Sequence, residues 1–291
     1  MILAISTVTG ETASAANEDE IVIEGKRAAE ETAATARALV RELGLTLYDR
    51  QVARWHRPIC AQVYGLTAAE SDAVARRIQL IAESLGAGLA GQDCSPNLSV
   101  LFSHDPDEDL RVMKTSRPSL FADVPPTKRD ALFAPGRPIR WWYVIERRGE
   151  NGRRLMSEQP AFIGRTSSGK SVLGAREGTT FGKRWTSTLL SEGGRRTLRA
   201  ASAVIDLEQV GDLPLRGLAD HAALVTLAEF GIEIPPSRGS VLGLFEEDGA
   251  QQLSPWDYSV LQAIYAVDRD RSARAQRSRM VSELVELRDG D

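Results

Sequence analysis

The chain has 291 residues, of which 42% are hydrophobic and 26% charged, and these values suit one large soluble domain or two small ones. Its 36 Lys and Arg residues against 40 Asp and Glu residues give a net charge of −4, which excludes the overall basic excess of a nucleic-acid-binding protein. The sequence contains no apolar run of about 18 residues, so we expect no membrane-spanning helix.

Residues 1–16 are predicted to be a partial signal peptide. A short apolar start is followed by the small residues Ala13-Ser14-Ala15, which are typical of a signal-peptidase site, and the sequence turns polar at Asn17. We interpret this as a signal whose start codon was assigned too late; the alternative is a disordered N-terminus rich in Ala, Ser and Thr. The signal reading predicts a periplasmic or secreted protein.

Residues 17–45 are expected to be a linker and an N-terminal helix, and residues 46–291 a single α+β domain. Apolar residues recur at helical spacing from Lys26 to Leu43, where Gly44 provides a C-cap. Within the linker, residues 21–23 could form a short edge strand.

A strand, helix, strand unit is predicted over residues 58–103. The strand at 59–64 precedes a capping box of Thr67 and Glu70, which opens a helix with one apolar stripe, and a second strand follows at 97–102. The simplest arrangement is a parallel βαβ crossover. Cys60 and Cys94 stand at the starts of these strands, so a disulfide is geometrically reasonable, although two free buried cysteines are the alternative.

Residues 104–137 show little periodicity and are predicted to be turns. The acidic run from His104 to Asp109 resembles a calcium loop but breaks its pattern, with Leu110 in place of Gly and Ser116 in place of Glu, which favours a solvated acidic turn. A strong strand at 140–147 forms a hairpin with 154–157. Its aromatic residues 141–143 alternate between faces, which predicts a sheet buried on both sides.

The longest consistent series of elements runs from Ala200 to Tyr265. A buried strand at 203–207 leads into a helix at 214–230, a loop rich in Gly, Pro and Ser, and a capped helix at 255–266; an Arg-rich helix at 269–287 ends the chain. The fold class is therefore predicted to be α+β, a mixed sheet with an N-terminal βαβ unit and C-terminal helices.

One motif match indicates nucleotide binding. Residues 164–171 fit the P-loop pattern through Gly164, Gly169, Lys170 and Ser171. A P-loop must open a helix, yet glycines recur every four residues from Gly174, each at a cost of about 1 kcal/mol in a helix. We therefore prefer a hairpin loop and keep a P-loop nucleotide binder as an alternative.

The histidines give no preformed metal site. His221 lies on a predicted helix, but Val225 occupies the position of a second zinc ligand, so we predict no metal and no cofactor. Asp220, His221 and Asp257 are the remaining catalytic candidates. A hydrolase site there would require His221 to face a polar cleft with a carboxylate within hydrogen-bond reach.

From Ile21 to Leu287 the chain resembles an uncharacterised family of exported proteins from alphaproteobacteria of the sphingomonad and caulobacter kind. The matching motifs are Pro58-Ile59-Cys60, Cys94-Ser95-Pro96-Asn97-Leu98, Ala203-Val204-Ile205-Asp206, residues 218–224, residues 240–245 and Trp256-Asp257 with Ile264-Tyr265. The resemblance implies export and a disulfide between Cys60 and Cys94, and it implies no activity.

The order of elements from residue 200 onward is also similar to zincin peptidases of the matrixin kind. On that alignment His221 stands at the first metal ligand, Ala222 at the catalytic Glu and Val225 at the second His. The resemblance implies a degenerate zincin-like domain without metal or general base. We therefore expect a non-catalytic periplasmic or envelope protein with a peptide-binding or structural role, whose partner is a peptide or envelope protein and not nucleic acid. The alternative is a hydrolase around Asp220 and His221.

Overall fold

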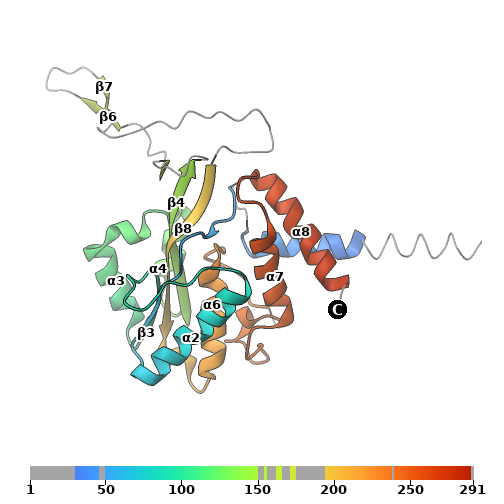
Figure 1. Cartoon of the computed structure of the whole chain (residues 1–291). Helices are drawn as coiled ribbons and strands as arrows, with labels where there is room; N and C mark the ends of the chain where they lie inside the picture. The colour runs from blue at the N-terminus through green and yellow to red at the C-terminus, as the bar shows by residue number, and fades with distance from the viewer. Residues whose placement is uncertain are drawn as a thin grey trace, which may run out of the picture.

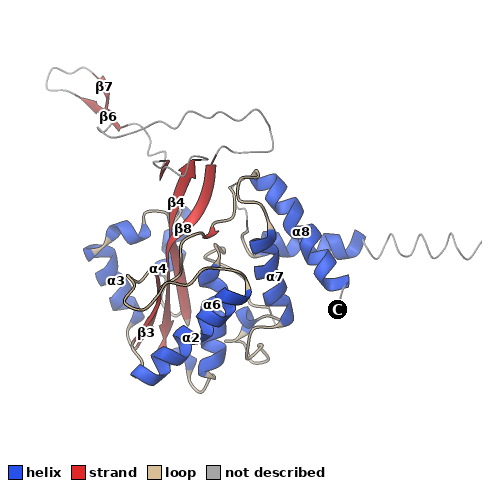
Figure 2. Cartoon of the chain, in the orientation of Figure 1, coloured by secondary structure: helices blue, strands red, loops and turns tan. Residues whose placement is uncertain are grey.

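The computed structural model describes residues 30–45, 50–149, 154–155, 162–165, 171–174, 194–237 and 239–289. The predicted signal peptide and the edge strand at 21–23 lie outside these residues. Within them the chain forms an α+β fold, in which helices cover both faces of a mixed sheet (Figures 1 and 2).

The main sheet has the order β2-β3-β8-β4-β5, and β1 also pairs with β8. Its strands are β1 (Arg54–Trp55), β2 (Ala61–Tyr64), β3 (Leu98–Ser103), β4 (Ile139–Gly149), β5 (Arg154–Leu155) and β8 (Gly194–Asp206). β1, β2 and β3 run parallel to their neighbours, whereas β4 is antiparallel to both β8 and β5. The predicted mixed sheet and the β4–β5 hairpin pairing are confirmed.

The βαβ unit is confirmed as well. β2 pairs in parallel with β3, and α2 (Ala68–Ser84) connects them, starting at the complete Thr67 and Glu70 capping box. Cys60 and Cys94, just before the two strands, form a disulfide with their Cα atoms 6.0 Å apart. This bridge ties together the loops that lead into the two strands.

Residues 104–137 correct the sequence prediction of turns. They form α3 (Pro106–Ser116), a short 3-10 helix η2 (Pro118–Phe121) and α4 (Pro126–Phe133). Asp105 is the N-cap of α3, Pro106 opens it, and the acidic residues occupy its first turn, where they interact favourably with the helix dipole. The acidic run is therefore a helix start instead of a solvated turn. Only Pro106 and Leu110 of α3 are buried.

The sheet separates two hydrophobic cores. Trp141 and Tyr143 face the larger core with α2 and α6 (Leu215–Leu227), while Trp142 faces the smaller core beneath α3 and α4. All three aromatic residues are buried, as their alternation predicts. The larger core includes Ala36 and Val40 from the helix at 30–42, so this N-terminal helix belongs to the same body as the sheet.

In the described part of the chain, the remaining elements are four helices that follow β8 and two short strands that lie between β5 and β8 in the sequence. They are α5 (Leu207–Val210), the 3-10 helix η3 (Val241–Gly243), α7 (Pro255–Ala266), α8 (Ala273–Asp289), and the separate hairpin of β6 (Phe162–Arg165) and β7 (Ser171–Gly174). Helix α8 buries Met280 and Leu284 against the larger core. Among the described residues, we find no helix both long and apolar enough to cross a bilayer.

Candidate functional site

The P-loop match does not have P-loop geometry. Gly164 and Ser171 lie in β6 and β7, which pair antiparallel with Arg165 opposite Ser171. Ser171 thus begins a strand where a P-loop needs the start of a helix. Gly169 and Lys170 lie outside the described residues.

His221 lies on α6 inside apolar packing. The residue is 2% exposed, and its ring lies 5.5 Å from the ring of Phe245 and 6.1 Å from that of Trp141, between centroids. Among the described residues, its Nδ1 atom has no hydrogen-bond partner. Burial lowers the pKa of His221 to about 4, so the imidazole is neutral at physiological pH. This environment is the opposite of the polar cleft that a hydrolase would need.

The structure brings the carboxylates of Asp220 and Asp257 to the same loop, where each accepts a hydrogen bond from one of two consecutive backbone N–H groups. Asp220 accepts a hydrogen bond from Leu253 N at 2.8 Å, and Asp257 accepts one from Ser254 N at 2.9 Å, at the start of α7. Both carboxylates are buried, at 0% and 3% exposure. The two carboxylates therefore fix adjacent residues of the loop that leads into α7.

Each of these carboxylates also has further partners. Asp220 receives a bidentate ion pair from Arg77 of α2, with distances of 2.5 and 3.1 Å. Asp257 completes a capping box with Ser254 and accepts hydrogen bonds from Ser240 Oγ and Val241 N. Because their oxygens are occupied by protein donors, the geometry supports structural roles for both: one joins α2 to α6, the other joins α7 to η3.

Aromatic side chains terminate α6. The carbonyls of residues 225, 226 and 227 have no partner within a helix that ends at Leu227, and they accept hydrogen bonds from Tyr143 OH, Trp55 Nε1 and Tyr265 OH at 2.6, 2.9 and 2.8 Å. The donors come from β4, β1 and α7. The end of α6 is thereby fixed to three elements, and the chain that follows leaves from a defined position.

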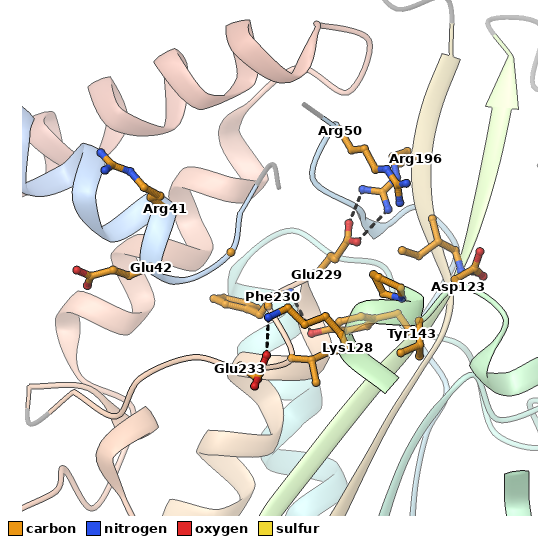
Figure 3. A pocket seen from close by; sticks show the side chains of 16 residues that line it. Arg41, Glu42, Arg50, Asp123, Lys128, Tyr143, Arg196, Glu229, Phe230 and Glu233 are labelled. Atoms are coloured by element: carbon orange, nitrogen blue, oxygen red, sulfur yellow. Dashed lines mark hydrogen bonds and ion pairs between the residues drawn. The ribbon is translucent and has the colours of Figure 1, made fainter. Parts of the chain in front are cut away.

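The segment after α6, residues 229–233, forms one wall of a pocket of about 280 Å³. The other walls come from the end of the N-terminal helix, the start of α4, β4 and β8 (Figure 3). Glu229 N donates to Ala53 O at 2.8 Å, and Gly231 N donates to Leu43 O at 2.9 Å. Between them Phe230 N donates to Tyr143 OH at 3.0 Å. Three consecutive residues are thus fixed by three different segments of the chain.

Two ion pairs flank the aromatic centre of this pocket. Arg196 of β8 binds Glu229 in a bidentate manner, at 2.6 and 2.9 Å, on one side of Phe230 and Tyr143, and Lys128 pairs with Glu233 on the other (Figure 3). Burial raises the pKa of Tyr143 well above its usual value, so its hydroxyl stays protonated and keeps its donor role.

The sequence analysis missed this pocket because its lining residues come from five separate segments. The best signal was local: the charged Glu229 interrupts the apolar run that begins in α6 and continues to the buried Phe230. In the part of the chain that the structure describes, no group of three His, Cys, Asp or Glu side chains could hold a metal ion.

The site has to be interpreted from its own geometry, because comparison of this chain with protein-family models, with characterised proteins and with solved structures finds no match to any of them.

Proposed function

We propose that the protein is a non-catalytic peptide-binding module of the cell envelope, and that the pocket beside Phe230 and Tyr143 holds the peptide. The observation that carries this proposal is the rigid construction of the pocket. Its wall at residues 229–231 is fixed at each residue to a different segment of the chain, and its charged side chains at Arg196 and Lys128 are already held in place. A pocket that is ordered before binding loses little conformational entropy when a ligand enters.

The chemistry of the walls favours a peptide. Eight charged residues line the pocket, four basic and four acidic: Arg41, Arg50, Lys128, Arg196, Glu42, Asp123, Glu229 and Glu233. Such a balanced set does not select a strongly anionic or cationic ligand. It suits a polymer with neutral polar backbone groups, while Ile145, Phe230 and Ile232 supply apolar contacts. The volume is at the small end of ligand pockets, which fits one or two side chains of a peptide.

A non-catalytic role is supported by the state of the titratable groups. Asp220 and Asp257 are occupied by hydrogen-bond donors, and His221 is neutral and enclosed by aromatic rings. A general base must be within reach of a substrate proton, and none of these three faces the pocket. The degenerate zincin-like reading agrees with this arrangement and stays part of the proposal.

The envelope location is supported by the disulfide between Cys60 and Cys94. Such bonds persist in oxidising compartments, and the chain has no other cysteine. Mass spectrometry of the protein purified from its native cells would test this part: we expect a mature N-terminus near Ala16 or Asn17 and an intact bridge. An uncleaved N-terminus with reduced cysteines would contradict export.

Peptide binding is tested by selecting from a pool of random peptides on the immobilised protein and measuring the selected peptides by calorimetry. We expect micromolar binding, no cleavage of bound peptide by mass spectrometry, and at least tenfold weaker binding by Lys128→Glu, which reverses a charge at the pocket. The matched control is Lys114→Glu, a charge reversal on α3 outside the pocket. Peptide turnover would instead support the hydrolase reading, and equal loss in both variants would move the binding site elsewhere.

A further inference from the structure

A second, smaller cavity lies beside the pocket proposed to hold a peptide. Its volume is about 40 Å³, against about 280 Å³ for the first, which we call the charged pocket. Two residues line both cavities, Glu42 of the N-terminal helix and Phe230 of the segment after α6. Figure 3 shows Phe230 on the side of Tyr143 that faces the N-terminal helix. The two cavities are therefore neighbours that meet at Phe230.

The smaller cavity has apolar walls, and we call it the aliphatic pocket. Apart from Phe230, Pro235 and Trp256, its apolar lining consists of Leu, Ile and Val residues: Leu39, Leu43, Leu224, Ile234, Leu242 and Val260. The buried carboxylate of Asp257 also lines it, but both of its oxygens accept hydrogen bonds, from Ser240 Oγ and from two backbone N–H groups. A polar group entering this pocket would lose its hydrogen bonds to water without replacement, so the walls favour an apolar group.

The volume of the aliphatic pocket limits the size of that group. One water molecule needs about 10–15 Å³ on the same scale, so a volume of about 40 Å³ admits roughly three heavy atoms. The side chain of valine has three carbon atoms beyond the backbone and matches this volume, whereas an aromatic ring exceeds it.

The arrangement of the two pockets suits an extended chain. Side chains on one face of an extended peptide belong to residues i and i+2, which are about 7 Å apart. Two such side chains can enter the two pockets on either side of Phe230. The exposed Glu42 lies along both pockets, so a ligand that fills both passes the same side chain.

We propose that the two pockets are neighbouring subsites for one extended peptide, and that the aliphatic pocket selects a side chain of about the size of valine. The selected residue lies two positions from the residue held in the charged pocket. Leu39, Leu242 and Trp256, which are partly buried, determine this specificity because they form walls of the aliphatic pocket alone. The inference rests on the proposed peptide binding and adds the class of peptide that is bound.

The test uses the full chain and the tightest-binding peptide selected from the random pool. Each position of that peptide is replaced in turn by Gly, Val and Phe, and binding is measured by calorimetry. We expect two sensitive positions separated by one residue. At one of them valine should bind roughly tenfold tighter than glycine, which leaves the pocket empty, and tighter than phenylalanine, which does not fit.

Two variants change the aliphatic pocket in opposite directions. Trp256→Leu enlarges it and should shift the preference from valine towards phenylalanine, a gain that loss of folding could not produce. Leu39→Trp fills it and should remove the preference for valine. The matched control is Leu80→Trp, the same replacement at a residue of α2 that is 59% exposed and lines neither pocket, and it should keep the preference. Lys128→Glu, in the charged pocket, should weaken valine and glycine peptides by the same factor.

The outcomes separate this inference from the proposed function. If no peptide of the pool binds, peptide binding fails and the inference fails with it. If peptides bind but no position prefers valine, peptide binding stands and the selectivity is overturned. An unchanged preference in Trp256→Leu, or equal loss of preference in the Leu39 and Leu80 variants, would also overturn the selectivity alone. Circular dichroism melting verifies that each variant is folded when it is measured.

Discussion

The Asp220 side chain offers the sharpest test of whether α6 has a structural or a catalytic role. Replacement by Ala removes the bidentate pair with Arg77 and the hydrogen bond from Leu253 N. Losing one partner of a buried pair costs about 3–5 kcal/mol. The lower end applies here, because the Arg77 side chain is 29% exposed and can be rehydrated. We therefore expect the free energy of unfolding to fall by about 3 kcal/mol.

Urea denaturation followed by circular dichroism measures this loss, and for a chain of this size it corresponds to a fall in melting temperature of roughly 6–12 °C. The matched control is Glu108→Ala, which removes the partner of Arg111 from an exposed pair on α3 and should leave stability nearly unchanged. Asp220→Ala would refute the reasoning if it unfolded at the same urea concentration as the unchanged protein. It would also do so if it abolished a peptide-cleaving activity without loss of stability.

Three further predictions concern the same framework. Cys60→Ser with Cys94→Ser should lower the free energy of unfolding by about 4 kcal/mol, because the bridge closes a loop with a sequence separation of 34. Reduction of the unchanged protein by dithiothreitol should lower its free energy of unfolding by the same amount. The folded pKa of His221 is below its unfolded value, so the free energy of unfolding should be at its full value above about pH 6.5 and fall by about 2 kcal/mol towards pH 5. His221→Phe should remove this pH dependence when unfolding by urea is measured at several pH values. An unchanged pH dependence in that variant would contradict the prediction. Tyr143→Phe removes the hydroxyl that binds Val225 O and Phe230 N and should cost about 2–3 kcal/mol, visible as faster amide exchange at Phe230, while unchanged exchange would argue against that contact.

Much of the fold was predictable because its signals are local. The capping box at Thr67 fixed the start of α2, and the helix predicted at 255–266 has the observed bounds of α7, which begins at a second capping box. The alternation of Trp141, Trp142 and Tyr143 predicted a sheet buried on both faces. In each case a few neighbouring residues contain all the information that the element needs.

The errors occur where tertiary contacts decide the outcome. Helix α3 is short and buries only Pro106 and Leu110, and the usable signal for its start, Asp105 followed by Pro106, was taken for a turn. The sequence could place Asp220 and Asp257 on their helices, but not the N–H groups of residues 253 and 254 that bring the two carboxylates together. The pocket was beyond reach for the same reason, since Arg196 and Glu229 meet only when β8 and the segment after α6 are assembled.

The end of α6 links the stability of the fold to the proposed binding site. Tyr143 both terminates α6 and fixes Phe230 in the pocket wall, whereas Lys128 lines the pocket through an ion pair whose partner is half exposed. A ligand that binds only the folded chain raises the melting temperature through mass action. Substitution at Tyr143 should therefore lower both the melting temperature without peptide and its rise with peptide. Substitution at Lys128 should reduce only the rise, because that pair holds no element of the core in place. If the Tyr143 variant kept the full rise in melting temperature with peptide, or the Lys128 variant lowered the melting temperature without peptide, the end of α6 would not organise the pocket.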